Sequence, residues 1–153
     1  MLFLLCTVGD ERYLLPTDVV GEVLPLVALR PLPHAPACVA GLMDYRGRPL
    51  PVLDLCRLLI DSPCAQRLSS RIVVVRLAAD DGRSHALGLL LERATETLKL
   101  TADALQAPGI AHADAPYLGR IARDAQGMLQ EISPADILGR VDSRLLFGDD
   151  DVA

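Results

Sequence analysis

Short runs of apolar and β-branched residues, each followed by a turn signal, recur along almost the whole chain. The strongest run is RIVVVRL at residues 71–77, whose continuous β-branched core predicts a strand buried on both faces. Similar runs predict strands at residues 2–8, 12–15, 22–27, 38–43, 50–53, 84–91, 94–100, 117–123 and 128–132. Short strands with regularly spaced turns favour a mainly β, barrel-type fold.

Three features refine this pattern. Pro25 confines its strand to an edge or a bulge, because proline has no N–H to donate to a neighbouring strand. Gly88 and the pair Glu92-Arg93 suggest bulges or bends within the stretch of residues 84–100. The polar pair Gln130-Glu131 suggests either that the last strand lies at the edge of its sheet or that its register is shifted by one residue.

Short helices are predicted where capping residues precede an apolar stretch. Asp54 is placed to cap a helix that runs to Ile60. Ser133 and Pro134 predict a closing helix to about residue 138. Single helical turns are expected after Thr17 and after Thr101. We expect residues 1–140 to form one domain and residues 141–153 to form a segment with an acidic tail.

The composition argues against nucleic-acid binding. The formal net charge is -5, aromatic residues make up 3% of the chain and Trp is absent. A nucleic-acid reader usually presents a basic patch and aromatic stacking platforms. Apolar stretches fall short of the roughly 20 residues that a membrane-spanning helix requires. We therefore expect a soluble, cytoplasmic protein.

The sequence shows few signs of catalysis. It lacks G-x-S-x-G and the glycine-rich phosphate loops. His34 lies in a proline-rich connector, His112 lies in a loop of small residues, and His85 begins a strand. Asp54 could act as an acid, but helix capping is the simpler role. We expect a protein that is not an enzyme and uses no cofactor.

The four cysteines, Cys6, Cys38, Cys56 and Cys64, form no C-x-x-C pair. In a chain of this size they are best interpreted as reduced thiols, several of them buried. His34 and Cys38 have a spacing that could suit a metal ion. Pro36 lies between them and argues against a helix that presents both ligands. No metal site is predicted.

The segment from Val39 to Leu55 reads VAGLMDYRGRPLPVLDL and carries the most specific signal. It resembles the CheW-family signature G-x-x-N-x-R-G-x-x-x-P-V-x-D-L. Seven residues match it: Gly41, Arg46, Gly47, Pro51, Val52, Asp54 and Leu55. The resemblance extends in order from the opening hairpin at Phe3 to the closing helix at Leu138. Asp44 and Tyr45 depart from the family pattern, in which an Asn and an apolar residue stand.

The resemblance implies two intertwined five-stranded SH3-like β-barrels with a few short helices. It also implies a non-enzymatic scaffold in a chemosensory pathway. Such a scaffold couples the cytoplasmic tip of chemoreceptors to the regulatory domain of a CheA-type histidine kinase. The expected location is then the cytoplasm, at membrane-associated receptor arrays.

The resemblance also implies a receptor-facing groove, an apolar surface rimmed by charge that would suit a coiled-coil tip. Its residues would be Val20, Glu22, Val23, Asp44, Arg46 and Gly47. Glu22 and Arg46 could pair with each other. For Val20 and Val23, packing in the core is an equally good interpretation. For Arg46 the alternative is a surface arginine that stabilises the turn, and we favour the binding role over it. For the kinase-facing surface no residue is predicted.

Two other functions stay open at this stage. One is a small-molecule-binding regulatory barrel with the ligand between the barrels, which would need a cavity lined by polar groups. The other is an enzyme of unrecognised type that depends on a histidine or on Asp54.

Overall fold

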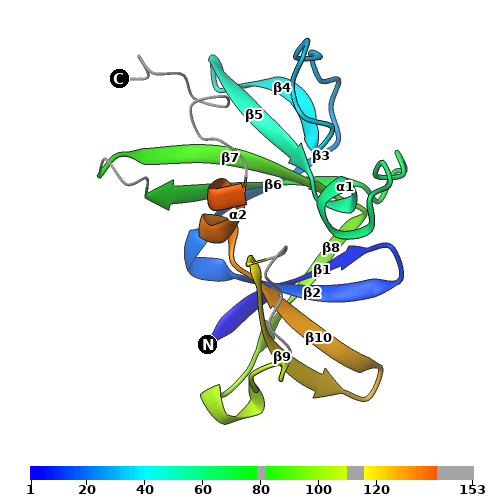
Figure 1. Cartoon of the computed structure of the whole chain (residues 1–153), viewed down its shortest axis with the longest axis vertical. Coiled ribbons are helices and arrows are strands. Elements are labelled where there is room, and N and C mark those ends of the chain that lie inside the picture. Colours follow the sequence, from blue (N-terminus) through cyan, green and yellow to red (C-terminus); the bar gives the residue numbers. More distant parts are fainter. Residues whose placement is uncertain (79–81, 110–115, 141–153) are drawn as a thin grey trace.

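The computed structural model describes residues 1–78, 82–109 and 116–140 (Figure 1). His112 and the segment 141–153 lie outside these ranges, as does most of the sequence Asp80-Asp81-Gly82, which is typical of a turn. Every predicted strand of the sequence is present within a few residues. The ten described strands form two five-stranded sheets, joined by short helices.

The first sheet, here called the terminal sheet, takes its strands from both ends of the chain. Its order is β8-β1-β2-β10-β9. The bounds are β1 (Leu2–Val8), β2 (Glu11–Pro16), β8 (Arg93–Lys99), β9 (Leu118–Asp124) and β10 (Gly127–Ile132).

The second sheet, here called the central sheet, uses the middle of the chain in the order β3-β6-β7-β5-β4. The bounds are β3 (Val20–Pro25), β4 (Val39–Tyr45), β5 (Arg48–Asp54), β6 (Arg71–Ala78) and β7 (Ser84–Leu91). Figure 1 shows the central sheet in the upper half and the terminal sheet in the lower half.

The two sheets share one pattern of strand pairing, although the chain passes through their strands in a different order. Each contains a single parallel pair, β2 with β10 and β5 with β7, among otherwise antiparallel neighbours. Each parallel pair precedes a short helix: α1 (Leu55–Ile60) follows β5, and α2 (Pro134–Arg140) follows β10. Two 3₁₀ turns complete the elements, η1 (Thr17–Val19) and η2 (Ala102–Ala104).

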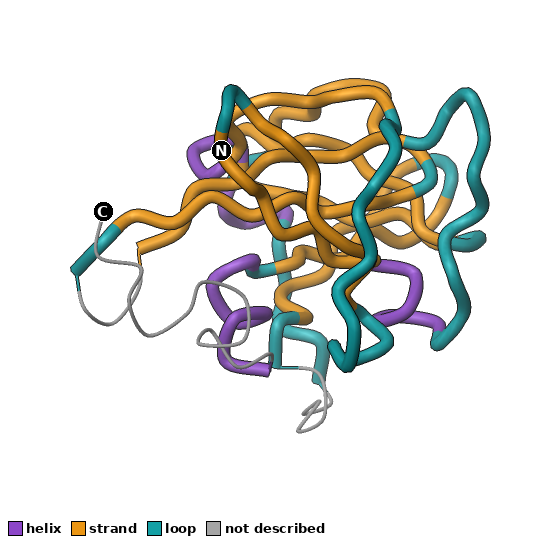
Figure 2. Tube along the Cα trace, turned by 90° about the horizontal axis from the view of Figure 1, so that it is seen from above, coloured by secondary structure: helices purple, strands orange, loops and turns teal. Residues whose placement is uncertain are grey.

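Isolated bridges bring the outer strands of each sheet toward each other. Arg30, in the segment after β3, pairs with Leu42 of β4. Gln106, in the segment after β8, pairs with Ile121 of β9. Each sheet thus curls toward a closed, SH3-like barrel, which reduces its exposed edges. Figure 2 shows the strands in orange through the upper and central part of the view, with purple helical segments beside and below them.

One hydrophobic core joins the two units. Strands β1 and β2 contribute Leu4, Cys6 and Leu15, which belong to the same cluster as Val73 of β6 and Leu89 of β7. A smaller cluster fills the terminal sheet and consists of Phe3, Leu14, Leu105, Ala122 and Leu129. The shared core explains why aliphatic residues can stabilise this fold with few aromatic rings.

The expected burial of residues 71–77 is confirmed, because Ile72, Val73, Val74 and Val75 have no exposed surface. Pro25 ends β3 at the outer position of its sheet, as predicted.

Two predictions about sheet detail were wrong. Gly88 makes no bulge: it pairs in register with Val74 and Val52. A Cβ on Gly88 would lie 3.0 Å from Ile72 Cγ2, so glycine is present for close packing. Strand β10 is not an edge strand, because it lies between β2 and β9. Its polar side chains reach β9 instead: Arg120 Nε donates to Glu131 Oε1 over 2.6 Å.

Candidate functional site

Glu22 and Arg46 form an ion pair between β3 and the turn that follows β4. Arg46 Nη2 donates to Glu22 Oε1 over 2.7 Å. β3 and β4 are the outer strands of the central sheet, and the Arg30–Leu42 bridge helps bring them together. The side chains are 69% and 31% exposed, so the pair contributes at most about 1 kcal/mol to folding. Its exposed position leaves it available to a partner.

The turn at Arg46–Gly47 fixes where the guanidinium stands. Both residues have positive φ, 53° and 79°, as a two-residue type I′ hairpin requires. Asp44 Oδ1 accepts a hydrogen bond from the Gly47 N–H over 3.0 Å. An Asn side chain offers the same acceptor, so the replacement of the family Asn by Asp44 keeps the turn and adds a negative charge.

Tyr45 contacts both members of the ion pair. The guanidinium carbon of Arg46 lies 5.2 Å from the centroid of the Tyr45 ring, within cation–π range. The Tyr45 hydroxyl donates a long hydrogen bond, 3.5 Å, to Glu22 Oε1. Tyr45 therefore belongs to the site although the sequence analysis treated it only as a departure from the family pattern. Its position next to Arg46 was the available signal.

The two valines lie differently. Exposure alternates along β3: Val20, Glu22 and Leu24 are half-buried, whereas Val23 is 39% exposed. Val20 packs against the main core. Val23 lies on the face of β3 opposite to Glu22, as the alternation of a strand requires. The structure thus brings together Glu22, Asp44, Arg46 and Gly47, and it places Val23 apart from them.

Asp54 performs the predicted capping role. Its Oδ1 accepts hydrogen bonds from the N–H groups of Cys56 (2.9 Å) and Arg57 (3.2 Å) at the start of α1. Its Oδ2 accepts a third, from the Cys64 N–H over 2.9 Å. Asp54 is 6% exposed and its carboxylate accepts three hydrogen bonds, so it is a structural anchor of the central sheet.

The cysteines are thiols, and Cys6, Cys56 and Cys64 are buried, as predicted. Burial raises the pKa of the Cys6 thiol to about 12. The pKa of Cys64 is raised further, chiefly by a hydrogen bond with Cys56 and then by burial. Such protonated thiols are poor nucleophiles. Of the histidines, His34 is exposed and His85 is half-buried, in a strand.

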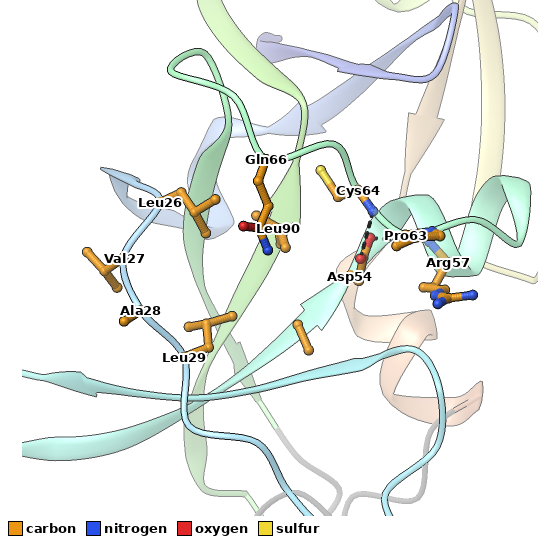
Figure 3. A pocket seen from close by; sticks show the side chains of 11 residues that line it. Leu26, Val27, Ala28, Leu29, Asp54, Arg57, Pro63, Cys64, Gln66 and Leu90 are labelled. Carbon is orange, nitrogen blue, oxygen red and sulfur yellow. Dashed lines mark hydrogen bonds between the residues drawn. The ribbon is translucent and has the colours of Figure 1, made fainter.

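A pocket of about 590 Å³ opens beside Asp54 (Figure 3). The segment 26–29 after β3 forms one wall, and Arg57, Cys64, Gln66 and Leu90 contribute to the rest. All its lining residues belong to the segment from Leu26 to Leu90. The pocket is therefore within the central unit and not between the two barrels.

The fold and the exposed ion pair define a class of protein: two SH3-like barrels on a shared core, with a charged turn at the surface. A family model described as "CheW-like domain" matches residues 2–142. The chain therefore belongs to the CheW-like domain family. Within the part of the chain that the structure describes, the helices are all too short to cross a membrane.

Three curated proteins are similar to the chain. Protein FrzA of Myxococcus xanthus is 48% identical over 52 residues, 34% of this chain and 32% of FrzA. Chemotaxis protein CheW of Rhizobium meliloti (strain 1021) is 29% identical over 94 residues, 61% of this chain and 57% of that protein. The probable chemotaxis protein CheW of Rhizobium etli is 26% identical over 99 residues, 65% of this chain and 61% of that protein. The matches thus span from about a third to three fifths of these relatives' lengths.

A solved structure has the same fold. The crystal structure of the scaffolding protein TtCheW from Thermoanaerobacter tengcongensis superposes with a TM-score of 0.78 and 21% sequence identity. The superposition covers 90% of this chain and 86% of TtCheW. This likeness supports the two-barrel architecture that the sequence resemblance implied.

Proposed function

We propose that the chain is a non-enzymatic adaptor that couples chemoreceptors to a CheA-type histidine kinase. Membership of the CheW-like domain family supports this proposal, together with relatives that are named as chemotaxis proteins. A protein with this role would act in the cytoplasm at receptor arrays. The high pKa of the buried thiols and the structural role of Asp54 also favour binding over catalysis.

The observation that carries the proposal is the exposed Glu22–Arg46 pair on a rigid hairpin. We infer that a receptor tip binds at Val20, Glu22, Val23, Asp44, Arg46 and Gly47. A helical hairpin with flanking charges would meet the opposite charges of Glu22 and Arg46, whose charged atoms lie 2.7 Å apart. The Tyr45 ring contacts the Arg46 guanidinium and helps to hold it in place. Rim charges of this kind set orientation and specificity more than affinity. Val23, on the other face of β3, would contact the receptor only at the border of this surface.

The test is a pull-down from cytosolic and detergent-solubilised lysate of the source cell, with captured proteins identified by mass spectrometry. The baits are wild type, Arg46→Glu and Arg123→Glu. Arg123 is exposed on β9 of the terminal sheet and provides the same charge change at a distant position. We expect Arg46→Glu to lower receptor recovery about tenfold, equivalent to about 1.4 kcal/mol, with kinase recovery retained.

The control should recover receptor and kinase as wild type does. A double variant, Glu22→Arg with Arg46→Glu, restores the ion pair in reverse and tests whether the pair or its polarity matters. Equal receptor recovery by Arg46→Glu and wild type would place receptor binding elsewhere. Recovery of neither protein by a folded bait, with both present in the lysate, would refute the adaptor function.

The pocket beside Asp54 gives a specific reason to consider a second function, a regulatory barrel that binds a small molecule. Its volume of about 590 Å³ is large enough for a metabolite. A metabolite library screened by thermal shift would favour this function if a compound raised the melting temperature and Leu29→Trp, which fills the pocket, abolished the effect.

A further inference from the structure

Two thiols and a carboxylate meet in the core of the central sheet. One ligand atom each from Asp54, Cys56 and Cys64 lie within 4.8 Å of one another. The residues are 6%, 0% and 7% exposed. The spacing of Cys56 and Cys64, eight residues apart, gives no recognisable motif, so the sequence analysis did not pair them.

Backbone N–H groups donate hydrogen bonds to the Asp54 carboxylate, and these bonds fix the positions of the two cysteines. The bonds from Asp54 Oδ1 to the N–H groups of Cys56 and Arg57 fix the first turn of α1, which carries the Cys56 thiol. The bond from Oδ2 to the Cys64 N–H fixes the segment that carries the second thiol. A carboxylate has about four acceptor positions, so Asp54 keeps one for a further ligand after these three bonds.

A fourth group lies beside the cluster and comes from another part of the chain. Glu92, directly after β7, places its Oε1 3.9 Å from Cys56 Sγ. The three clustered donor atoms are two sulfurs and one carboxylate oxygen, from the β5–α1 junction and the α1–β6 connection. Glu92 lies outside this 4.8 Å group and would supply a second oxygen only by moving closer to Asp54 and Cys64. Zn²⁺ commonly takes four ligands, with Cys sulfur and Asp or Glu oxygen among those that bind it in proteins.

We propose that Asp54, Cys56 and Cys64 form a binding site for Zn²⁺, with Glu92 beside Cys56 as the nearest further carboxylate. A divalent cation at this site would replace the two thiol protons, and the two thiolates together with the Asp54 carboxylate would supply the charge that holds it. The softness of the two sulfurs disfavours Mg²⁺ and Ca²⁺, which prefer oxygen ligands alone. Binding releases the thiol protons and ties the β5–α1 junction to the α1–β6 connection.

The pocket borders part of the cluster. Asp54 and Cys64 line it, and Figure 3 shows their dashed hydrogen bond at its edge. A cation in the pocket would meet Asp54 and Cys64 first, whereas Cys56 does not line the pocket and has no exposed surface. Arg57 lines the same pocket, and its positive charge opposes the binding of cations there.

The proposal is tested on the full chain, reduced and freed of metal by chelation. Equilibrium dialysis against Zn²⁺, read by elemental analysis, should give one Zn²⁺ per chain. Co²⁺ used as a probe should give the thiolate charge-transfer band and the visible bands of a tetrahedral site. Cys56→Ala and Cys64→Ala should each weaken binding more than tenfold. Cys38→Ala removes a thiol outside the cluster and should leave binding unchanged.

A second measurement does not depend on the folding of any variant. Wild type is alkylated during partial urea unfolding with and without Zn²⁺, and the modified cysteines are mapped by mass spectrometry. Zn²⁺ should slow modification of Cys56 and Cys64 more than that of Cys38. The proposal is overturned if the folded, reduced chain binds no Zn²⁺, if binding survives in both alanine variants, or if Co²⁺ shows an octahedral spectrum without the charge-transfer band.

Discussion

Tyr117 donates its hydroxyl to the carbonyl oxygen of Leu58 over 3.0 Å, and this bond joins the two barrels. Tyr117 precedes β9 of the terminal sheet, whereas Leu58 lies in α1 of the central unit. The tyrosine is 2% exposed and belongs to the shared core. A bond at this position fixes how the terminal barrel meets α1.

We expect Tyr117→Phe to lower the free energy of unfolding by about 1 kcal/mol, because the Leu58 carbonyl loses a partner in a partly buried position. Urea unfolding monitored by circular dichroism measures the change. Tyr45→Phe is the matched control, since its hydroxyl makes a longer bond of 3.5 Å near the surface. Equal losses in the two variants would contradict a specific role for the Tyr117 bond.

Gly41→Ala should destabilise the chain by at least about 2 kcal/mol. Gly41 has a φ of +147°, and an added Cβ would lie 2.6 Å from the Arg30 carbonyl oxygen. That carbonyl accepts the Leu42 N–H in the bridge that draws the outer strands together, so relief of the clash must disturb the bridge.

Gly127→Ala separates the steric effect from backbone strain. Gly127 has a φ of +121°, but an added Cβ there meets no atom within 4 Å. Thermal unfolding of both variants should show the larger loss for Gly41→Ala. A Gly127→Ala variant that is destabilised as much would show that backbone conformation alone accounts for both.

The strands could be predicted from the sequence because each depends mainly on residues that are close together in the chain. The apolar run of β6 and the glycine turn at Arg46–Gly47 can each be recognised from a few consecutive residues. The role of Asp54 as a cap was equally local. The pairing of Glu22 with Arg46 came from the resemblance to a family and not from spacing, since 24 residues separate them.

Contacts between residues that are distant in the sequence could not be predicted from it. The third hydrogen bond of Asp54, to Cys64, depends on the path of the chain after α1. The edge position predicted for β10 was wrong because polar residues in a strand normally indicate solvent. Here Glu131 is neutralised by Arg120 of the adjacent strand, which allows a charged residue in an interior strand. Gly88 was misread because its packing partners, Ile72 and Val52, are distant in sequence.

Val74→Asp should abolish cooperative folding. Val74 has no exposed surface and lies in β6 between β3 and β7. An unpaired carboxylate there costs several kcal/mol, which is comparable to the whole stability of a domain. Arg76→Asp, at an exposed position of the same strand, is the control and should stay folded. A Val74→Asp variant with a normal unfolding transition would refute the buried position of β6.

The ion pair between Arg12 and Asp124 should make stability depend on pH in the acid range. Arg12 donates two hydrogen bonds to the Asp124 carboxylate, at 2.8 and 2.6 Å. They lower the pKa of Asp124 from 3.8 to about 2. The unfolded chain therefore binds more protons between these values, so the contribution of the pair is full above the unfolded pKa and is lost as the pH falls through the folded one.

Two measurements check this expectation. The difference in unfolding free energy between wild type and Asp124→Asn should be largest above about pH 4 and should shrink toward pH 2. NMR titration of the Asp124 carboxyl should give a midpoint near pH 2 in wild type, and Arg12→Gln should shift it up toward 3.8. An unchanged midpoint in Arg12→Gln would show that the Gln126 N–H, which also donates to Asp124, is sufficient to hold the carboxylate ionised.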